Sequence, residues 1–185
     1  MIESIKECKK CGLCNNQKPL LDKKKMCEVI WVGLSAKKVV DIDSDIPLSN
    51  DTNSGSLINQ VENACSDIKT YRTNIVKCLP LDDNQKLRYP KTEEINRCFQ
   101  NLVAEIEEFS PKLVFLLGQK VSIAVQKNFG IIFEKSKDYN YIWKKYEDTY
   151  YIPIHHPSYI SVYKRKYVQL YINGIKKVID ELMGI

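Results

Sequence analysis

Hydrophobic residues along the chain fall into short continuous runs separated by longer stretches with helical spacing. Three of the runs are EVIWVG (28–33), RTNIVKC (72–78) and KLVFLLG (112–118). Their apolar and β-branched composition is typical of buried parallel strands. A tyrosine-rich stretch over 138–154 predicts two further strands or a hairpin. Together these patterns predict the strands of one central sheet.

The intervening stretches carry apolar residues at intervals of three or four, which predicts helices over 54–67, 92–109, 119–128 and 166–183. Asn53 or Ser54 is a candidate cap of the first helix, and Glu93 and Glu94 fall in the first turn of the second. Alternating strands and helices predict a three-layer α/β/α fold with a central four-stranded parallel sheet. We expect residues 1–185 to form a single domain.

Several residues that can carry chemistry lie at or just after the ends of the predicted strands. They are Gly33, Asn74, Gly118, and the only two histidines of the chain, His155 and His156. Ligands of parallel sheets bind outside the carboxyl ends of the strands. The sequence therefore predicts a ligand site at this edge of the sheet.

Composition narrows the class of protein only slightly. The formal charge of +5 suits a polyanionic partner, but it would equally serve solubility alone. No apolar run approaches the roughly 20 residues that span a bilayer, and the first residues are charged and lack a signal-peptide core. We expect a cytoplasmic monomer with no membrane association.

Seven cysteines are many for such a chain, and their odd number argues against a disulfide framework. Cys8, Cys11 and Cys14 form a C-x2-C-x2-C run among lysines, while Cys78 and Cys98 lie much later. Two closely spaced thiolates can share a metal centre if further ligands come from elsewhere. From the spacing alone, zinc and an iron–sulfur cluster both remain open.

The order of several motifs resembles the iron–sulfur branch of the uracil-DNA glycosylase superfamily, the families usually counted as four and five. These motifs are the N-terminal C-x2-C, TNIVKC (73–78), PKTEEINRC (90–98), LLGQKVSIAV (116–125) and HPSY (156–159). Each motif alone is weak evidence, but the order of all five matches that of the family along nearly the whole chain.

This resemblance implies a structural 4Fe-4S cluster held by Cys8, Cys11, Cys78 and Cys98, with Cys14 as an apolar neighbour. It also implies DNA as the partner and hydrolysis of the N-glycosidic bond of a flipped-out base.

The resemblance further implies roles for individual side chains. His156 would stabilise the departing base and Asn74 would read its Watson–Crick edge. Without the motif, Asn74 would be interpreted as an ordinary turn asparagine. Ser158 would help to shape the loop and hold a phosphate, and Tyr159 or Ile160 would fill the gap left by the flipped nucleotide. Lys164, Arg165 and Lys166 would either meet phosphates or form a solvated helix start.

The first motif departs from the resemblance. Family four carries an acid, a proline and a glycine after the first strand and a stacking aromatic later, whereas this chain has Gly33-Leu34-Ser35-Ala36-Lys37 and Leu48. Family five shares the Gly-Leu pair and also lacks that acid. Leu34, Ser35 and Leu48 would line a relaxed base pocket. Asp41 or Asp43 could replace the water-activating acid, or could simply belong to an exposed polar loop.

Three hypotheses follow. The first is a monofunctional DNA glycosylase acting on a deaminated or modified base, including bulky modified pyrimidines of phage DNA in antiviral defence. The second is an ordinary uracil repair enzyme that tolerates the changed motif. The third is a catalytically inactive DNA-binding module.

Overall fold

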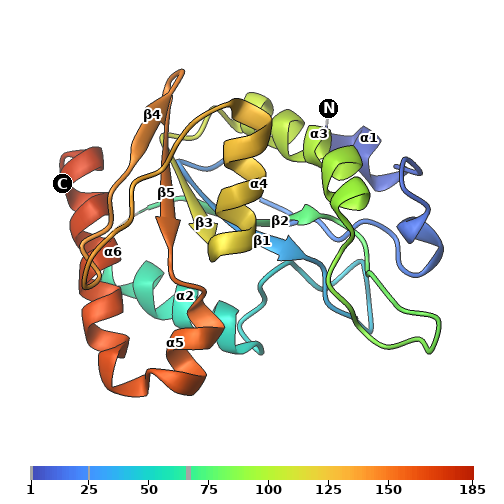
Figure 1. Cartoon of the computed structure of the whole chain (residues 1–185), viewed down its shortest axis with the longest axis horizontal. Coiled ribbons are helices and arrows are strands. Elements are labelled where there is room, and N and C mark those ends of the chain that lie inside the picture. Colours follow the sequence, from blue (N-terminus) through green and yellow to red (C-terminus); the bar gives the residue numbers. More distant parts are fainter. Residues whose placement is uncertain (1, 25, 66–67) are drawn as a thin grey trace.

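The computed structural model describes residues 2–24, 26–65 and 68–185 (Figure 1). Its elements are α1 (Ile2–Lys6), a 3₁₀ turn η1 (Leu13–Asn15), β1 (Val29–Ser35), α2 (Asn53–Ala64), β2 (Thr70–Val76), α3 (Thr92–Phe109), β3 (Leu113–Leu117), α4 (Gln119–Phe129), β4 (Lys144–Tyr146), β5 (Thr149–Ile154), α5 (Pro157–Tyr163), a second 3₁₀ turn η2 (Arg165–Tyr167) and α6 (Val168–Met183).

The sheet has five strands in the order β2-β1-β3-β5-β4. The first four are parallel, as predicted, and β4 adds an antiparallel edge through its hairpin with β5. The expected four-stranded parallel sheet is therefore corrected to a mixed sheet of five strands. In the register, Gly33 of β1 pairs with Asn74 of β2, so two predicted site residues are neighbours across the ladder.

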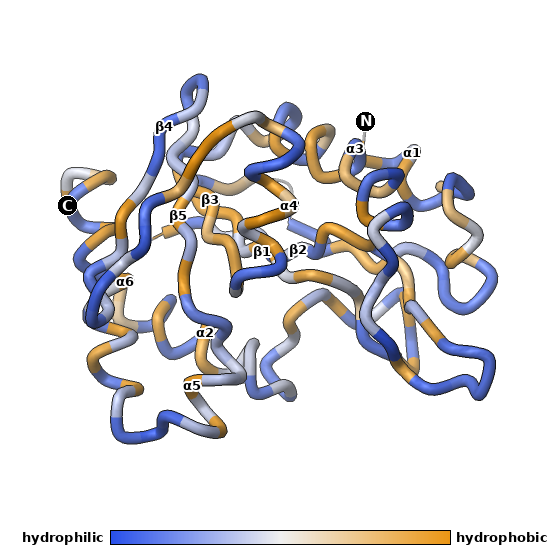
Figure 2. The backbone as a smooth tube through the Cα atoms, in the orientation of Figure 1, coloured by the Kyte–Doolittle hydropathy of each residue, from blue (hydrophilic) through white to orange (hydrophobic). Residues whose placement is uncertain are grey.

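Helices cover both faces of the sheet, which makes the predicted three layers. Figure 1 shows α3 and α4 on one face and α2, α5 and α6 on the other. Along β1, Ile30 and Val32 pack beneath the first layer, while Trp31 packs beneath the second and stacks on Phe115 with ring centroids 4.6 Å apart. Hydrophobic segments concentrate in the central strands, and hydrophilic ones follow the outer loops (Figure 2).

The structure corrects the predicted helices in three places. The first begins at Asn53 with Thr52 as its cap, because Thr52 Oγ1 accepts a hydrogen bond from the Gly55 amide at 3.0 Å. It ends at Ala64, and residues 66–67 of the predicted range lie outside the described residues. The stretch after His156, expected to be a loop, is helix α5, since proline suits the first position of a helix. The predicted helix over 166–183 is divided into η2 and α6.

None of the helices among the described residues has the length and apolar character needed to cross a membrane.

A buried ion pair joins β2 to α3. Lys77, directly after β2, and Glu105 of α3 have no exposed side-chain surface and form a salt bridge. Lys77 Nζ also donates to Thr73 Oγ1 at 2.7 Å and to the Asn74 carbonyl at 2.6 Å, while Tyr71 OH donates to Glu105 at 2.9 Å. Each polar atom of this buried network has a partner, which is the condition for placing two charges in a core.

We predict that Lys77→Met lowers the free energy of unfolding by about 3–5 kcal/mol, because it leaves the Glu105 carboxylate buried without a counter-charge. Urea unfolding of anaerobically purified protein, followed by circular dichroism, measures this change. Lys176→Met is the matched control: it breaks the solvent-accessible Lys176–Asp180 pair and should leave the free energy of unfolding nearly unchanged. Equal effects of the two substitutions would contradict the assigned role of the buried pair.

Candidate active site

A cavity of about 1050 Å³ opens at the carboxyl ends of the parallel strands. Its walls are the ends of β1, β2 and β3, the loop that follows β1, the loop before α3, and the start of α5. Nine residues predicted for the site line it: Gly33, Leu34, Ser35, Leu48, Asn74, Gly118, His156, Ser158 and Tyr159. Side chains distant in the sequence thus meet around one space.

Asn74 lies across the backbone of Gly33. A Cβ atom at position 33 would stand 2.2 Å from Asn74 Oδ1 and 3.3 Å from a methyl group of Leu48. Only glycine therefore leaves room for this orientation of the amide. The Asn74 carbonyl accepts from the buried Lys77 Nζ, which fixes the backbone that carries the amide.

His156 follows β5 and caps α5, and its ring lines the cavity. Gly118, with φ +89°, lies against it: a Cβ at position 118 would approach His156 Cβ to 3.1 Å. Partial burial lowers the pKa of the His156 imidazole below its usual value, which favours the neutral ring at pH 7.

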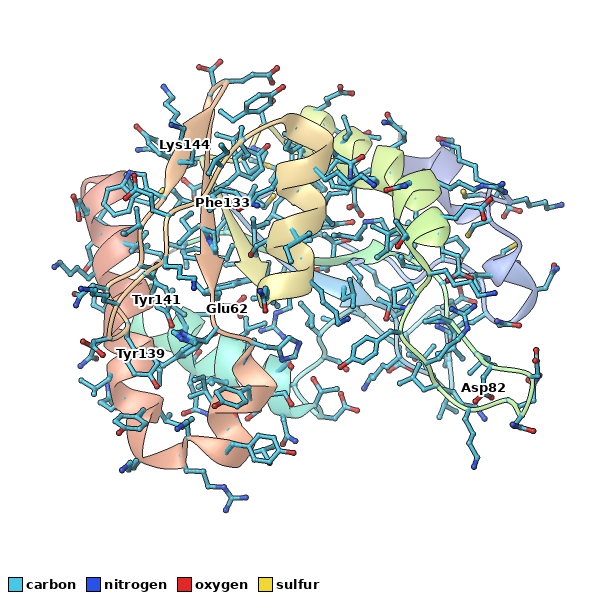
Figure 3. All side chains as sticks on the ribbon, viewed as in Figure 1. Glu62, Asp82, Phe133, Tyr139, Tyr141 and Lys144 are labelled. Atoms are coloured by element: carbon cyan, nitrogen blue, oxygen red, sulfur yellow. The ribbon has the colours of Figure 1, made fainter. Side chains whose placement is uncertain are left out.

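His155 belongs to an aromatic cluster beside the cavity and is not among its lining residues. Its Nδ1 lies 3.1 Å from Tyr141 OH, and its carbonyl accepts from Tyr171 OH at 3.1 Å. Figure 3 shows Tyr139 and Tyr141 beside α6, and the Tyr139 ring lies 5.2 Å from that of His155. His155 therefore orients the backbone that presents His156.

A buried arginine holds the wall that contains Leu48. The Arg72 guanidinium donates to the Leu48 carbonyl at 2.8 Å and to Asn50 Oδ1 at 2.7 Å, and it forms a salt bridge with Glu62 at 2.5 Å. Leu48 itself has φ +52°, a conformation unusual for a residue with a side chain. Leu48 is thus held in place by contacts outside the cavity.

Asp51 is the one carboxylate among the described residues that line the cavity. Lys37 Nζ donates to it at 2.8 Å, and this hydrogen bond lowers the pKa of Asp51, which stays ionised at neutral pH. Asp41 and Asp43, predicted as candidate acids, do not line the cavity. They are exposed, and the Asp43 amide donates to Asp41 Oδ1 at 2.9 Å in a local turn. Asp51 was not predicted, because nothing in the local sequence distinguishes it from Asp41 and Asp43 in the same loop.

The predicted DNA-contacting residues divide between surface and core. Tyr159 is 44% exposed at the cavity rim, whereas Ile160 is fully buried and cannot act as a wedge. Lys164, Arg165 and Lys166 are exposed just after α5 but do not line the cavity. Tyr163, which was not predicted, does line it.

Five cysteines gather at the base of α3. Burial raises the pKa of the Cys78 thiol, and the neighbouring sulfurs of Cys98, Cys11, Cys14 and Cys8 raise it further. No three histidine, cysteine or acidic side chains of the described residues are spaced to hold a single metal ion. A multi-iron cluster is larger than one ion, so this spacing does not count against it.

Hydrogen-bond donors are directed at two of these sulfurs. Asn101 Nδ2 lies 3.4 Å from Cys8 Sγ and 3.6 Å from Cys98 Sγ, and the Lys77 amide lies 3.4 Å from Cys98 Sγ. Cys14 Sγ instead lies 3.9 Å from Asn15 Oδ1, an acceptor beside it in the chain. Donors around Cys8 and Cys98 suit thiolate ligands. The donor set therefore fits an iron–sulfur cluster.

Comparison with known proteins places this arrangement in a family. The sequence model of the uracil DNA glycosylase superfamily matches residues 24–182. The chain belongs to the uracil DNA glycosylase superfamily. Its shared region contains the whole cavity lining except Leu20, but the N-terminal cysteines lie outside it.

Two type-4 uracil-DNA glycosylases are similar in sequence. The chain is 26% identical to that of Sulfurisphaera tokodaii over 117 residues, 61% of this chain and about half (47%) of the relative. It is 24% identical to that of Saccharolobus solfataricus over 97% of this chain and 80% of the relative. The crystal structure of wild-type Pedobacter heparinus SMUG2 shares the fold, with a TM-score of 0.57 and 13% identity over 86% of this chain and 77% of that one.

We predict that His156 titrates below about 6.5, the ordinary histidine pKa, because its partial burial disfavours the imidazolium. NMR titration measures this directly, since the chain has two histidines and each gives one set of ring signals. Signals are assigned by His155→Gln and His156→Gln, and urea-unfolded protein supplies the reference. A His156 pKa at or above that of the unfolded chain would contradict the neutral ring.

Proposed function

We propose that this protein is a monofunctional DNA glycosylase that removes uracil or another deaminated base from DNA. The observation that carries the proposal is that Asn74 and His156, from separate strand ends, face one cavity and are each packed against a glycine. The superfamily membership and the type-4 relatives support the same reaction class.

The reaction breaks the bond between C1′ of the sugar and a ring nitrogen of the base, and a bond forms between C1′ and a water oxygen. The base leaves with the bonding electron pair, so negative charge develops on its carbonyl oxygens, and the proton that the attacking water loses ends on the released base. Neutral His156 donates a hydrogen bond there, and the Asn74 amide both donates to and accepts from the Watson–Crick edge.

Asp51 is the proposed partner of the attacking water. Its carboxylate faces the cavity and remains charged, so it can orient the water and offset the positive charge that develops on the sugar. Lys37 fixes its position through the 2.8 Å hydrogen bond. Asp51 would therefore replace the acid that family four carries after its first strand.

A second candidate substrate is a bulky modified pyrimidine, as in phage DNA. The wall formed by Leu34 and Leu48 favours it, because an aliphatic side chain, Leu48, stands where family four carries the aromatic ring that stacks on the base. A role in antiphage defence rests on this alternative alone.

We further propose that Cys8, Cys11, Cys78 and Cys98 hold a structural 4Fe-4S cluster and that the protein acts as a monomer bound to DNA. The directed Asn101 and Lys77 donors support the cluster. When bound, it would secure the N-terminal segment against the rest of the fold. That segment in turn supports the cavity: Asn16 Nδ2 donates to the Leu79 carbonyl at 2.9 Å and Gln17 Nε2 to the Lys37 carbonyl at 3.1 Å.

We predict that anaerobically purified protein releases uracil from an oligonucleotide and leaves an alkali-sensitive abasic site. His156→Ala and Asn74→Ala should each lower the single-turnover rate by about 100-fold or more, because each removes a hydrogen bond made to the leaving base. Parallel oligonucleotides carry hypoxanthine, xanthine or a modified cytosine. Release from the modified cytosine alone would favour the second candidate, and unchanged rates in both variants would refute the assigned roles.

The carboxylate assignment has matched controls in the same loop. Asp51→Asn should slow base release by at least about tenfold, whereas Asp41→Asn and Asp43→Asn should change it less than about twofold. If either control loses activity while Asp51→Asn does not, the water-activating carboxylate is Asp41 or Asp43 and not Asp51. DNA binding without base release from any substrate would refute the glycosylase proposal and support the hypothesis of a catalytically inactive DNA-binding module.

We predict about four iron and four sulfide atoms per chain after anaerobic purification, with a broad visible absorption band. Replacing Cys78 or Cys98 by serine should abolish the iron content. Cys14→Ser and Cys65→Ser should retain it. Full iron content in Cys78→Ser, or stoichiometric zinc in its place, would contradict the proposed ligand set.

A further inference from the structure

The tyrosines are distributed unevenly between core and surface. Of the eleven in the chain, three are exposed, namely Tyr89, Tyr159 and Tyr163. All three line the one cavity described above. Tyr159 and Tyr163 come from α5 and form a tilted pair with ring centroids 5.7 Å apart. Tyr89 comes from the loop before α3, which follows β2, the edge strand on the side of the sheet opposite the β4–β5 hairpin.

Tyr89 is presented by a well-anchored part of its loop. The neighbouring Arg88 makes hydrogen bonds of 2.8 and 2.6 Å to the two carboxylate oxygens of Glu94 and donates to the Leu81 carbonyl at 2.8 Å. Figure 3 shows Asp82 at the far tip of the same loop. Although its base is fixed in this way, the Tyr89 side chain is 70% exposed. Because the ring is exposed and the backbone beside it is held in place, a ligand can pack against the ring.

A lysine accompanies this ring. Lys120 Nζ, from the first turn of α4, lies 4.3 Å from the centre of the Tyr89 ring, and Lys120 also lines the cavity. Among the described residues no carboxylate forms a salt bridge with Lys120, whereas Arg88 and Lys37 are each paired with one. The ammonium lies over one face of this largely exposed ring. A base can therefore stack on the opposite face while the ammonium meets the phosphate of the same nucleotide.

We propose that Tyr89 and Lys120 form a second nucleotide subsite, where Tyr89 stacks on an unpaired base flanking the excised one and Lys120 contacts its phosphate. This inference rests on the proposed function and deepens it by naming single-stranded DNA as the preferred substrate. In a duplex the flanking bases are already stacked and paired, so no base face is free to stack on the Tyr89 ring. In a single strand each base has a free face, and one base–aromatic contact is worth several-fold to more than tenfold in affinity.

The test measures binding of a fluorescent oligothymidylate by anisotropy, in parallel with the same sequence as a duplex. Tyr89→Ala should weaken single-strand binding about tenfold and duplex binding less than about twofold, while Tyr89→Phe keeps the ring and should bind like the parent protein. Lys120→Gln should reduce the slope of log affinity against log salt by about 0.7 for the single strand, the contribution of one phosphate.

Lys145→Gln is the matched control, because Lys145 also lies over a tyrosine, Tyr150, at 5.6 Å but on the β4–β5 edge and not in the cavity. It should leave binding unchanged. Equal losses on duplex and single strand, a loss in Tyr89→Phe as large as in Tyr89→Ala, or an effect of Lys145→Gln matching that of Lys120→Gln would each overturn the subsite. The assay needs no base release, so a chain that binds as expected but releases no base refutes only the proposed function. Uracil release with no binding change in Tyr89→Ala refutes only the subsite.

Discussion

Lys77 connects the parts of this molecule that matter for its chemistry. Its ammonium, buried against Glu105, donates to the carbonyl of Asn74, the residue proposed to read the base. Its amide lies 3.4 Å from Cys98 Sγ, and its carbonyl accepts from the Leu20 amide at 2.8 Å. A charge without a counter-ion would be strongly disfavoured at this buried position, so the carboxylate on α3 stabilises the ammonium that holds the Asn74 carbonyl.

The N-terminal segment shows why a chain of this size would use a cluster. Helix α1 has five residues and buries Ile5, and the stretch that follows adds one short 3₁₀ turn that buries Leu13. So little apolar burial cannot hold a segment by itself. Its Asn16 and Gln17 side chains nevertheless contact both loops that wall the cavity. Covalent links from Cys8 and Cys11 to Cys78 and Cys98 would supply the missing constraint.

Patterns of apolar residues were sufficient for the parallel strands and for α3, whose predicted bounds match the observed ones. A helix of 18 residues with one buried face repeats its apolar positions often enough for the helical period to be clear. They were insufficient for α5, because seven residues beginning at Pro157 are too few to show a helical period. The convergence of Gly33, Asn74 and His156 followed from topology and needed no side-chain detail. Asp51 and Tyr89 could not be found in this way, since only the folded loops distinguish them from exposed neighbours.

The electrostatics of the cavity favour a leaving group that becomes charged during the reaction. Asp51 is paired with Lys37 and Arg88 with Glu94, so these charges largely cancel before a ligand arrives. Asn74 is an uncharged amide and the lowered pKa of His156 favours its neutral ring, so the two groups proposed to contact the base bring no full charge that would have to lose water to admit it. Hydrogen bonds from these two groups strengthen as negative charge grows on the departing base. Selectivity for the reacting state then comes from oriented dipoles, and the glycines at 33 and 118 let both side chains approach closely enough to act.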